Sequence, residues 1–327
     1  MKISFIVPLY NCLPLTQAML ASLQATLPAG LAHEIIFVDD GSTDGTRGWL
    51  APLPAPCRAL LNEKNLGFAG ACNRGAAVAR GEFLFFLNND LVLLPGWLEP
   101  MLAVVSAYAD AGLVGNVQLN HATGAVDHTG LTFNAKGKPE HLTARGWSAL
   151  RPVVAVTGAC FAIRTATWRQ LGGFDEGYVN GCEDVDLGLR ARQAGLANYV
   201  VRRSVVRHHI SASIGRKLRD EQNTARLVQR WRPVILTLIP PACARACVAA
   251  AWENPRDYVH SRLVREALLY AAGLLPQPTR LIRAAAAASL DLEAARWAHL
   301  LDGAPARPPR EVAGILFPTY QDGAPVY

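Results

Sequence analysis

Hydrophobic stretches that stop at acidic clusters constrain the fold of this chain more than any other feature. The clusters follow one another along the sequence as Asp39-Asp40-Gly41-Ser42-Thr43-Asp44, Asn88-Asn89-Asp90 and Glu183-Asp184-Val185-Asp186. Each is expected at the end of a strand or at the start of a helix. In open α/β sheets, ligands bind outside the carboxyl ends of the strands. The order therefore predicts one polar site along one edge of a sheet.

Strand and helix patterns alternate in the first part of the chain. Apolar runs of strand length are followed by segments with helical periodicity or small residues. The expected strands are Ile3 to Val7, His33 to Val38, Arg58 to Leu61, Glu82 to Leu87 and Gly112 to Val117, and the expected helices open near Pro14, Gly67 and Pro95. This alternation predicts an α/β fold with a doubly wound, mostly parallel, Rossmann-like sheet.

The pattern changes after residue 117. Residues 118–152 are rich in Gly and Thr and predict hairpins and loops, where an acceptor could bind. We then expect a strand over Val153 to Ile163, helices over Thr165 to Leu171 and Asp184 to Ala194, and a strand over Tyr199 to His208. Beyond Trp231 the chain becomes rich in Ala, Leu and Arg with proline breaks. These shifts predict a main domain over residues 1–232 and a helical C-terminal extension and tail over residues 233–327.

Composition and charge narrow the class of protein. The 327 residues are 51% hydrophobic and 18% charged, which is typical of a globular protein and far from disorder. The net charge of +6 favours an anionic partner, but nucleic acid, acidic lipid and a nucleotide diphosphate would all fit. The seven cysteines lie in apolar contexts, as reduced thiols do, and Cys243 and Cys247 lack a second ligand pair at zinc spacing.

No segment is predicted to carry the chain across a membrane. The apolar stretch Met1 to Val7 is too short for a secretory signal. No apolar run reaches the roughly 18–20 residues that cross a bilayer, and the nearest, Val234 to Trp252, is interrupted by two prolines and an arginine. We therefore expect a cytoplasmic protein, and a peripheral contact at the inner face of the membrane stays open.

Asp39 and Asp40 end an apolar strand and precede Gly41 and Ser42. A turn there would present two carboxylates to a crevice, where they could accept hydrogen bonds from a base or a ribose. Asp and Ser also favour turns and helix N-caps for local hydrogen-bonding reasons. From these residues alone the two interpretations have equal weight.

Asp90 closes the most hydrophobic strand of the chain, after Asn88 and Asn89. A carboxylate there could hold a divalent cation against a diphosphate, although a polar turn before Pro95 is the alternative. One acid with two amides is a weak cage, so a further ligand is needed. His208, which ends a Val-rich strand, is a candidate for that ligand. The sequence does not decide between His208 and its neighbour His209.

Glu183 and Asp184 open a helix that carries Arg190 and Arg192 near its far end. This charge order complements the helix dipole and needs no function. A carboxylate at a helix start that faces a crevice is also well placed to act as a general base. Asp184 is the first candidate for that role, and Glu183 is the second.

These motifs together resemble the family 2 glycosyltransferases, which have the nucleotide-sugar-binding GT-A fold. The resemblance covers roughly residues 1–232 and is similar to the rhamnosyl- and galactofuranosyltransferase-like branch. It rests on Val7-Pro8-Leu9-Tyr10-Asn11, Val38 to Asp44, Asn65-Leu66-Gly67-Phe68-Ala69-Gly70 with Asn73, Asn88-Asn89-Asp90, Gly158-Ala159-Cys160, Gly172-Gly173-Phe174-Asp175-Glu176 and Glu183-Asp184-Val185-Asp186. No one of these motifs is specific, but their order is.

The resemblance implies a role for each matching residue. Nucleotide-sugar binding is implied for Pro8, Tyr10, Asp39, Asp40, Asn65, Asn73, Asn88 and Asn89, metal binding for Asp90 and His208, and catalysis for Asp184 with Glu183. It implies an inverting transfer from a nucleotide-diphosphate sugar to a hydroxyl of a glycan or lipid-linked glycan, with Mn²⁺ or Mg²⁺, in bacterial surface polysaccharide or cell-wall synthesis. Nucleic acid is not expected as a partner.

The chain departs from the family pattern where the usual Asp-x-Asp metal motif reads Asn88-Asn89-Asp90. One negative charge is missing, so the donor diphosphate is expected to supply part of the charge that attracts the cation. A decayed site in a non-catalytic nucleotide-sugar or glycan-binding protein is therefore the alternative. A dehydrogenase is disfavoured, because no G-x-G-x-x-G follows the first strand, and there is no P-loop.

Overall fold

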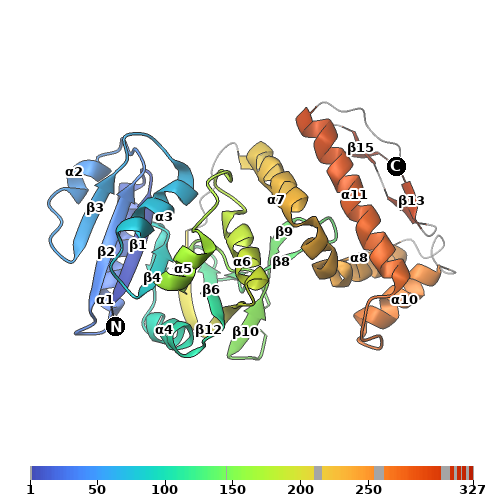
Figure 1. Cartoon of the computed structure of the whole chain (residues 1–327), viewed down its shortest axis with the longest axis horizontal. Coiled ribbons are helices and arrows are strands. Elements are labelled where there is room, and N and C mark those ends of the chain that lie inside the picture. The colour runs from blue at the N-terminus through green and yellow to red at the C-terminus, as the bar shows by residue number, and fades with distance from the viewer. Residues whose placement is uncertain are drawn as a thin grey trace. The chain divides into compact units, whose positions relative to one another are not determined.

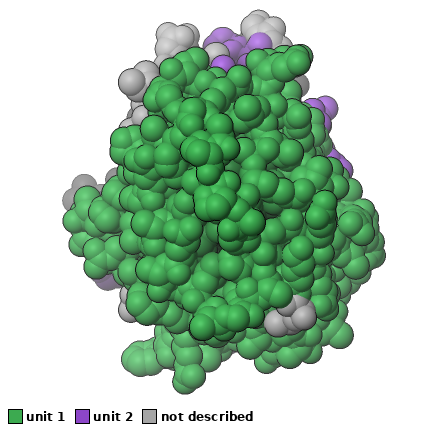
Figure 2. Space-filling model, turned by 90° about the vertical axis from the view of Figure 1, so that its left-hand side faces the viewer, with its two compact units in different colours: residues 1–132, 141–216 green, residues 133–140, 217–327 purple. Residues whose placement is uncertain are grey.

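The computed structural model describes residues 2–144, 146–209, 216–253, 261–302, 310–312, 315–317, 319–321 and 324–326. The chain divides into two compact units, which are described separately below (Figure 2). The first contains residues 1–132 and 141–216, and the second contains residues 133–140 and 217–327. The expected boundary at residue 232 falls inside one continuous helix, α7 (Arg216–Leu238).

The first unit is built on one large mixed sheet (Figure 1). Its strand order is β10-β12-β6-β11-β4-β1-β2-β3, with β5 against β12 and β7 against β6. The strands are β1 (Ile3–Leu9), β2 (His33–Asp39), β3 (Cys57–Leu61), β4 (Phe83–Leu87), β5 (Leu91–Leu93), β6 (Ala111–Asn120), β7 (Val126–His128), β10 (Leu150–Val153), β11 (Cys160–Arg164) and β12 (Ala197–His208). Parallel pairing joins β3, β2, β1 and β4, and also β6 with β12.

Helices cover both faces of this sheet. One apolar core joins a sheet face to Met19 and Leu23 of one helix and to Met101 of another. The opposite core contains Cys72 and Leu187, which lie on helices of the other layer. The helices are α1 (Leu13–Thr26), α2 (Thr46–Leu50), α3 (Gly67–Val78), α4 (Leu98–Ala107), α5 (Thr165–Leu171) and α6 (Glu183–Gln193). The expected doubly wound, mostly parallel architecture is confirmed.

The expectation of a single strand over Val153 to Ile163 is wrong. The chain leaves β10 at Val153 and enters β11 only at Cys160. The two strands pair with different neighbours, because β10 is antiparallel to β12 while β11 is antiparallel to both β4 and β6. Thr157 and Gly158 therefore form a loop rather than a continuous strand.

The second unit is mainly helical, as expected for the C-terminal region. It contains α7, α8 (Pro240–Glu253), α10 (Arg262–Ala271) and α11 (Arg280–Asp302), followed by β13 (Arg310–Val312), β14 (Ile315–Phe317), β15 (Thr319–Gln321) and β16 (Ala324–Val326). Two short antiparallel pairs thus occur in the segment expected as a tail. Within the parts of the chain described, no single helix has the length and apolarity of a membrane span. The helix pair Arg219–Leu238 and Pro240–Glu253 has them only when the two helices are taken together, and the chain bends by 71° between them.

A partly buried ionic network connects three segments of this unit. The segment 133–140, from the hairpin of β8 (Leu131–Phe133) and β9 (Pro139–His141), belongs to it. Lys138 on that segment lies 2.9 Å from Glu221 of α7 and 3.0 Å from Glu293 of α11. Glu221 also accepts hydrogen bonds from Arg296 and from the Trp297 indole. The pKa of Glu221 is lowered, since burial, which alone would raise it, is outweighed by the Lys138 and Trp297 hydrogen bonds.

Candidate functional site

The strand directions gather the predicted site residues at one edge of the sheet. β11 is antiparallel to both β4 and β6, so β6 and β12 run in the same direction as β4, β1 and β2. The carboxyl ends of these strands lead to Tyr10, Asp40, Asn88 and His208. This is the edge at which open α/β sheets bind ligands.

Asp90 and His208 are brought together by the pairing of β5 with β12. The register places His208 opposite Leu91, and Nε2 of His208 lies 3.2 Å from Oδ1 of Asp90. The Asp90 carboxyl is buried, yet its Oδ1 atom has no hydrogen-bond partner among the described residues. The neighbouring His209 has the backbone N–H that donates to the Asp90 carbonyl. The predicted pair of metal ligands therefore converges.

This donor set fits a cation that is shared with a ligand. Among the described residues, no group of three or more His, Cys, Asp or Glu side chains could hold a metal. The Asn89 side chain donates to Thr16 Oγ1 at 2.9 Å, so it braces the start of α1. Hard cations need more oxygen ligands than one carboxylate supplies. The Asp90 oxygen, which accepts no hydrogen bond from the described residues, and the imidazole of His208 are suitable ligands, provided that a bound diphosphate adds others.

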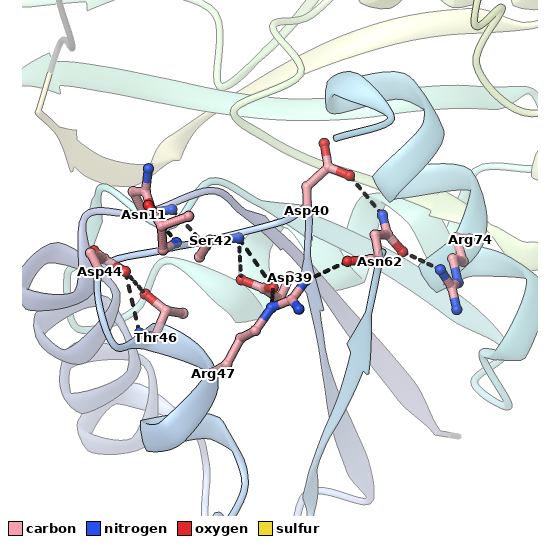
Figure 3. Close-up of polar contacts among 10 residues, drawn as sticks. Asn11, Asp39, Asp40, Ser42, Asp44, Thr46, Arg47, Asn62 and Arg74 are labelled. Carbon is pink, nitrogen blue, oxygen red and sulfur yellow. Dashed lines mark hydrogen bonds and ion pairs between the residues drawn. The ribbon is translucent and has the colours of Figure 1, made fainter. Parts of the chain in front are cut away.

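The side chains of Asp39 and Asp40 point in different directions (Figure 3). Asp39 is fully buried and accepts hydrogen bonds from the Ser42 N–H and, at 2.7 Å, from Nε of Arg47. Arg47 keeps 40% of its side chain exposed, so it could yield this carboxylate to a ligand. The predicted contact between Asp39 and a nucleoside is compatible with this geometry.

The Asp40 carboxylate already accepts several hydrogen bonds from the protein itself. Its carboxylate accepts hydrogen bonds from the Asn62 amide at 2.7 Å, from the Leu66 N–H at 2.8 Å and from the Gly67 N–H at 2.9 Å. Leu66 and Gly67 are at the start of α3, so Asp40 satisfies donors that the helix leaves unpaired. These contacts give Asp40 a structural role, whether or not it also contacts a donor.

The other predicted nucleotide-sugar residues differ in availability. Tyr10 and Asn65 are exposed, Asn88 is half-buried, and Pro8 is buried within β1. Asn73 links α3 to the segment that precedes α6, since its side chain exchanges hydrogen bonds with the backbone of Phe174 and donates to Glu176 at 2.8 Å. Asn73 is therefore committed to holding two segments together in this structure.

Asp184 lies in the first turn of α6 and is half-buried. Its Oδ2 atom accepts from the Gly158 N–H and its Oδ1 atom from the Val185 N–H, both at 2.8 Å. Burial raises the pKa of this carboxyl above the usual value for Asp, and the two backbone hydrogen bonds offset the rise only in part. A raised pKa makes a carboxylate a stronger base, which suits proton abstraction.

Glu183 is less available than Asp184. It is buried, and one carboxylate oxygen accepts from the Gly181 N–H at 2.6 Å, within the loop that leads into the helix. Asp186, the last acid of the motif, is fully buried and pairs with Arg190 at 2.8 Å. The geometry thus favours Asp184 over Glu183 as the base.

Several residues that contact the site carried no signal in the sequence. Arg47 and Asn62 bind the Asp39–Asp40 turn, and Asn180 accepts a hydrogen bond from the Phe68 N–H at the start of α3. His128 is completely buried, and His121 stacks on His209 with ring centroids 3.7 Å apart. Histidines 121 and 128 lie in residues 118–152, the region predicted as hairpins and loops, and no motif marked them there.

The fold is that of the GT-A glycosyltransferases. A crystal structure of GalNAc-T7 with UDP, GalNAc and Mn²⁺ superposes with a TM-score of 0.61 at 17% identity, over 76% of this chain and 51% of that one. The mannosyltransferase PcManGT from Pyrobaculum calidifontis, in complex with GDP-Man and Mn²⁺, superposes with a TM-score of 0.54 at 20% identity, over 92% of this chain and 87% of that one. At these identities the likeness concerns the fold.

Residues 4–168 match the family model "Glycosyl transferase family 2", and the chain belongs to that family. An N-acetylglucosaminyl-diphospho-decaprenol L-rhamnosyltransferase of Mycobacterium tuberculosis is 28% identical over 63% of this chain and 76% of its own length. The O-antigen biosynthesis protein RfbC of Myxococcus xanthus is 31% identical over 65% of this chain. The chain spans 18% of RfbC and 27% of an uncharacterized Sinorhizobium fredii protein, y4gI, that is 28% identical.

Proposed function

We propose that this protein transfers a sugar from a nucleotide-diphosphate donor to an acceptor hydroxyl with inversion at the anomeric carbon. The observation that carries the proposal is the presence, at one sheet edge, of a converging Asp90–His208 pair and a separate carboxylate, Asp184, with a raised pKa. A protein that only binds a nucleotide sugar needs the Asp90–His208 pair but has no need of a base such as Asp184. Family membership supports the reaction class.

In the proposed reaction, Asp184 accepts the proton of the acceptor hydroxyl while the oxygen attacks the anomeric carbon. The bond from that carbon to the diphosphate oxygen breaks, and the nucleoside diphosphate leaves with the electron pair. A single displacement needs no protein nucleophile. The hydrogen bonds from Gly158 and Val185 hold the Asp184 carboxylate in one orientation before the acceptor binds.

Asp90 and His208 would hold a divalent cation, Mn²⁺ or Mg²⁺. Such an ion supplies charge neutralisation on a departing diphosphate. The Oδ1 atom of Asp90 supports this role, because it contacts His208 but accepts no hydrogen bond among the described residues, and a buried carboxylate oxygen without a hydrogen bond costs free energy unless a ligand satisfies it. Tyr10, Asp39 and Asn88 lie at this edge and are the residues that we propose to contact the nucleotide. Asp39 is fully buried, so its contact would require Arg47 to move away from it.

The biological setting is proposed from the relatives. The rhamnosyltransferase acts on a diphospho-decaprenol acceptor by its name, and RfbC is an O-antigen biosynthesis protein. We therefore propose a glycan or lipid-linked glycan acceptor in bacterial surface polysaccharide or cell-wall synthesis, with the reaction in the cytoplasm. Relatives also include animal polypeptide N-acetylgalactosaminyltransferases, such as a mouse protein 30% identical over 56% of this chain.

The deciding experiment combines donor screening with one substitution. Thermal unfolding is measured with UDP, dTDP and GDP sugars, each with and without Mn²⁺, because a ligand of the native state raises its stability. Transfer and donor hydrolysis are then followed for the wild type, for Asp184→Asn and for the matched control Glu183→Gln. Loss of turnover in Asp184→Asn alone, with donor binding kept, supports the enzyme. Binding without turnover in the wild type favours the non-catalytic alternative.

A membrane contact of the second unit is a separate proposal. The buried side of α10 carries Leu263 and Ala267, whereas Arg262, Arg265, Leu268 and Leu269 are exposed. An exposed face that mixes arginines with leucines complements an anionic bilayer surface. We expect the full chain to sediment with anionic vesicles more than with neutral ones. Leu268→Glu with Leu269→Glu should abolish the difference, and unchanged sedimentation would exclude this face.

A further inference from the structure

His128, the last residue of β7, is an imidazole buried without exposure inside the first unit. Its Nε2 atom lies 3.3 Å from the backbone N of Thr157 and accepts that N–H. An accepting Nε2 must be unprotonated, so the neutral ring carries its proton on Nδ1. Nδ1 is buried and has no hydrogen-bond partner among the described residues.

An apolar side chain would fill this place at a lower cost. Burying a ring nitrogen without a partner costs about 1–3 kcal/mol. The ring of His141 packs against His128 in a T-shaped arrangement, with centroids 4.9 Å apart and an interplanar angle of 78°. The specific contact that an imidazole makes here, and that a leucine could not make, is the hydrogen bond to Thr157.

The Thr157 contact leads directly to the proposed base. Gly158, the next residue, donates its N–H to Oδ2 of Asp184 at 2.8 Å. The consecutive N–H groups of this loop are therefore held from two sides, by His128 on β7 and by Asp184 on α6. A Cβ atom at position 158 would lie 3.0 Å from the Phe68 ring and 3.6 Å from Cβ of Asp184, so a larger residue would require the Phe68 ring to shift by a few tenths of an ångström.

The imidazole stays neutral, which keeps the contact in place. Burial lowers the pKa of His128 well below its ordinary value, and the positive charges that His141 and His208 can carry act in the same direction. A protonated ring would present a second donor to the Thr157 N–H and break the hydrogen bond. Neutrality over the physiological range thus preserves one loop geometry.

We propose that His128 is a positioning residue for sugar transfer, which holds the Thr157–Gly158 loop so that the Gly158 N–H orients the Asp184 carboxylate. The inference rests on the proposed role of Asp184. Loss of the His128 acceptor would release the loop, weaken the Gly158 hydrogen bond and let the carboxylate rotate away from the acceptor hydroxyl. The donor subsite around Asp39 and Asp90 would be unaffected.

The test compares two substitutions at position 128 in the full chain. His128→Gln retains an acceptor oxygen, whereas His128→Leu removes it and stays apolar. For His128→Leu we expect kcat to fall about 10- to 100-fold, as for a small misplacement of a catalytic group. The donor KM should change little, and the acidic limb of the pH–rate profile should move to higher pH. His128→Gln should recover most of the rate and the wild-type limb.

Equal rates and equal acidic limbs in the two variants would overturn the proposal. An Asp184→Asn variant measured beside them separates the two hypotheses, since full activity there would refute the role of Asp184 itself. If His128→Leu does not fold, ¹⁵N NMR of the wild-type imidazole decides. The neutral tautomer with the proton on Nδ1 is expected between about pH 6 and pH 8, a range that includes the ordinary pKa of histidine. A proton on Nε2 would refute the contact.

Discussion

Nε2 of His208 lies 3.2 Å from Oδ1 of Asp90, and the geometry of this contact is not that of a hydrogen bond. Two ligand atoms that lie at ion-pair distance without a hydrogen bond between them can share a third group. The carboxylate is buried, so its charge needs compensation. In the proposed site, this relationship would let a motif with one acid fewer than usual hold a cation together with a bound diphosphate.

Cation binding is expected to depend on the donor. Mn²⁺ should bind weakly to the protein alone and at least about tenfold more tightly with a nucleoside diphosphate, because the diphosphate adds charge and oxygen ligands. Titration calorimetry with and without the diphosphate measures the difference. Asp90→Asn should remove most of the Mn²⁺ binding in both conditions. Equal affinities with and without diphosphate would refute the coupling.

A variant with an added carboxylate also tests whether the missing acid weakens cation binding. Asn88→Asp restores the acid that the family motif usually has, and it should raise the affinity for Mn²⁺ in the absence of donor. The matched control is Asn89→Asp, since Asn89 is held by Thr16 rather than directed to the pair. If both variants bind Mn²⁺ as the wild type does, position 88 does not belong to the cation site.

The pH dependence of transfer should report the raised pKa of Asp184. The base acts only when ionised, so the rate should increase with pH through the folded pKa, which lies above the ordinary value of 3.8. Asp184→Asn should lower kcat by roughly 10²- to 10⁴-fold, which is the usual contribution of a general base. The measurement is kcat against pH, with Glu183→Gln as the control. An acidic limb in the ordinary Asp range would contradict the raised pKa.

The strands of the sheet could be predicted from the sequence because each is marked by a short local pattern. Apolar runs of strand length and the residues that stop them are set by short-range pattern, and β1, β2, β4 and β12 form where expected. The turn at Thr157–Gly158 was not predicted, because β10 and β11 are separated by partner choice rather than by composition. A run of apolar residues does not indicate which strand it will pair with.

The site was predicted as a set of residues but not as a set of contacts. Asp90 and His208 meet because of the register between β5 and β12, which places residues distant in sequence opposite each other. The internal hydrogen bonds of Asp40 depend on the return of the chain at Asn62 and Leu66. No local pattern of charge or hydrophobicity encodes such long-range closures, so Asp39 and Asp40 looked equivalent in the sequence.

Asp40 is expected to contribute mainly to folding. Asp40→Ala would leave the Asn62 amide and two N–H groups at the start of α3 without their acceptor, which should destabilise the protein by about 1–3 kcal/mol. Glu63→Ala, an exposed position in the same loop, is the control and should change stability by less than about 0.5 kcal/mol. Denaturant unfolding measures both. Equal stabilities of the two variants would refute the structural role.

The network around Glu221 should make stability depend on pH. Glu221→Gln leaves Lys138 and Arg296 with a weaker partner, and we expect a loss of about 1–3 kcal/mol at neutral pH, as for hydrogen bonds between charged groups at a partly buried site. The folded pKa of Glu221 is lowered, so its ionised form stabilises the native state above the ordinary value near 4.5, and this contribution is lost as the pH falls through the lowered folded pKa. The difference between wild type and variant should therefore shrink on acidification.

Unfolding in denaturant at several pH values from neutral to strongly acidic measures that difference. Glu253→Gln, an exposed glutamate of α8, is the matched control and should show no such trend. A double variant with Lys138→Met tests the pairing directly, since residues in contact give non-additive losses. Additive losses, or a difference that is constant with pH, would show that Glu221 does not hold the 133–140 segment through its charge. Non-additive losses would show that this segment is stabilised by ionic contacts with helices far away in the sequence.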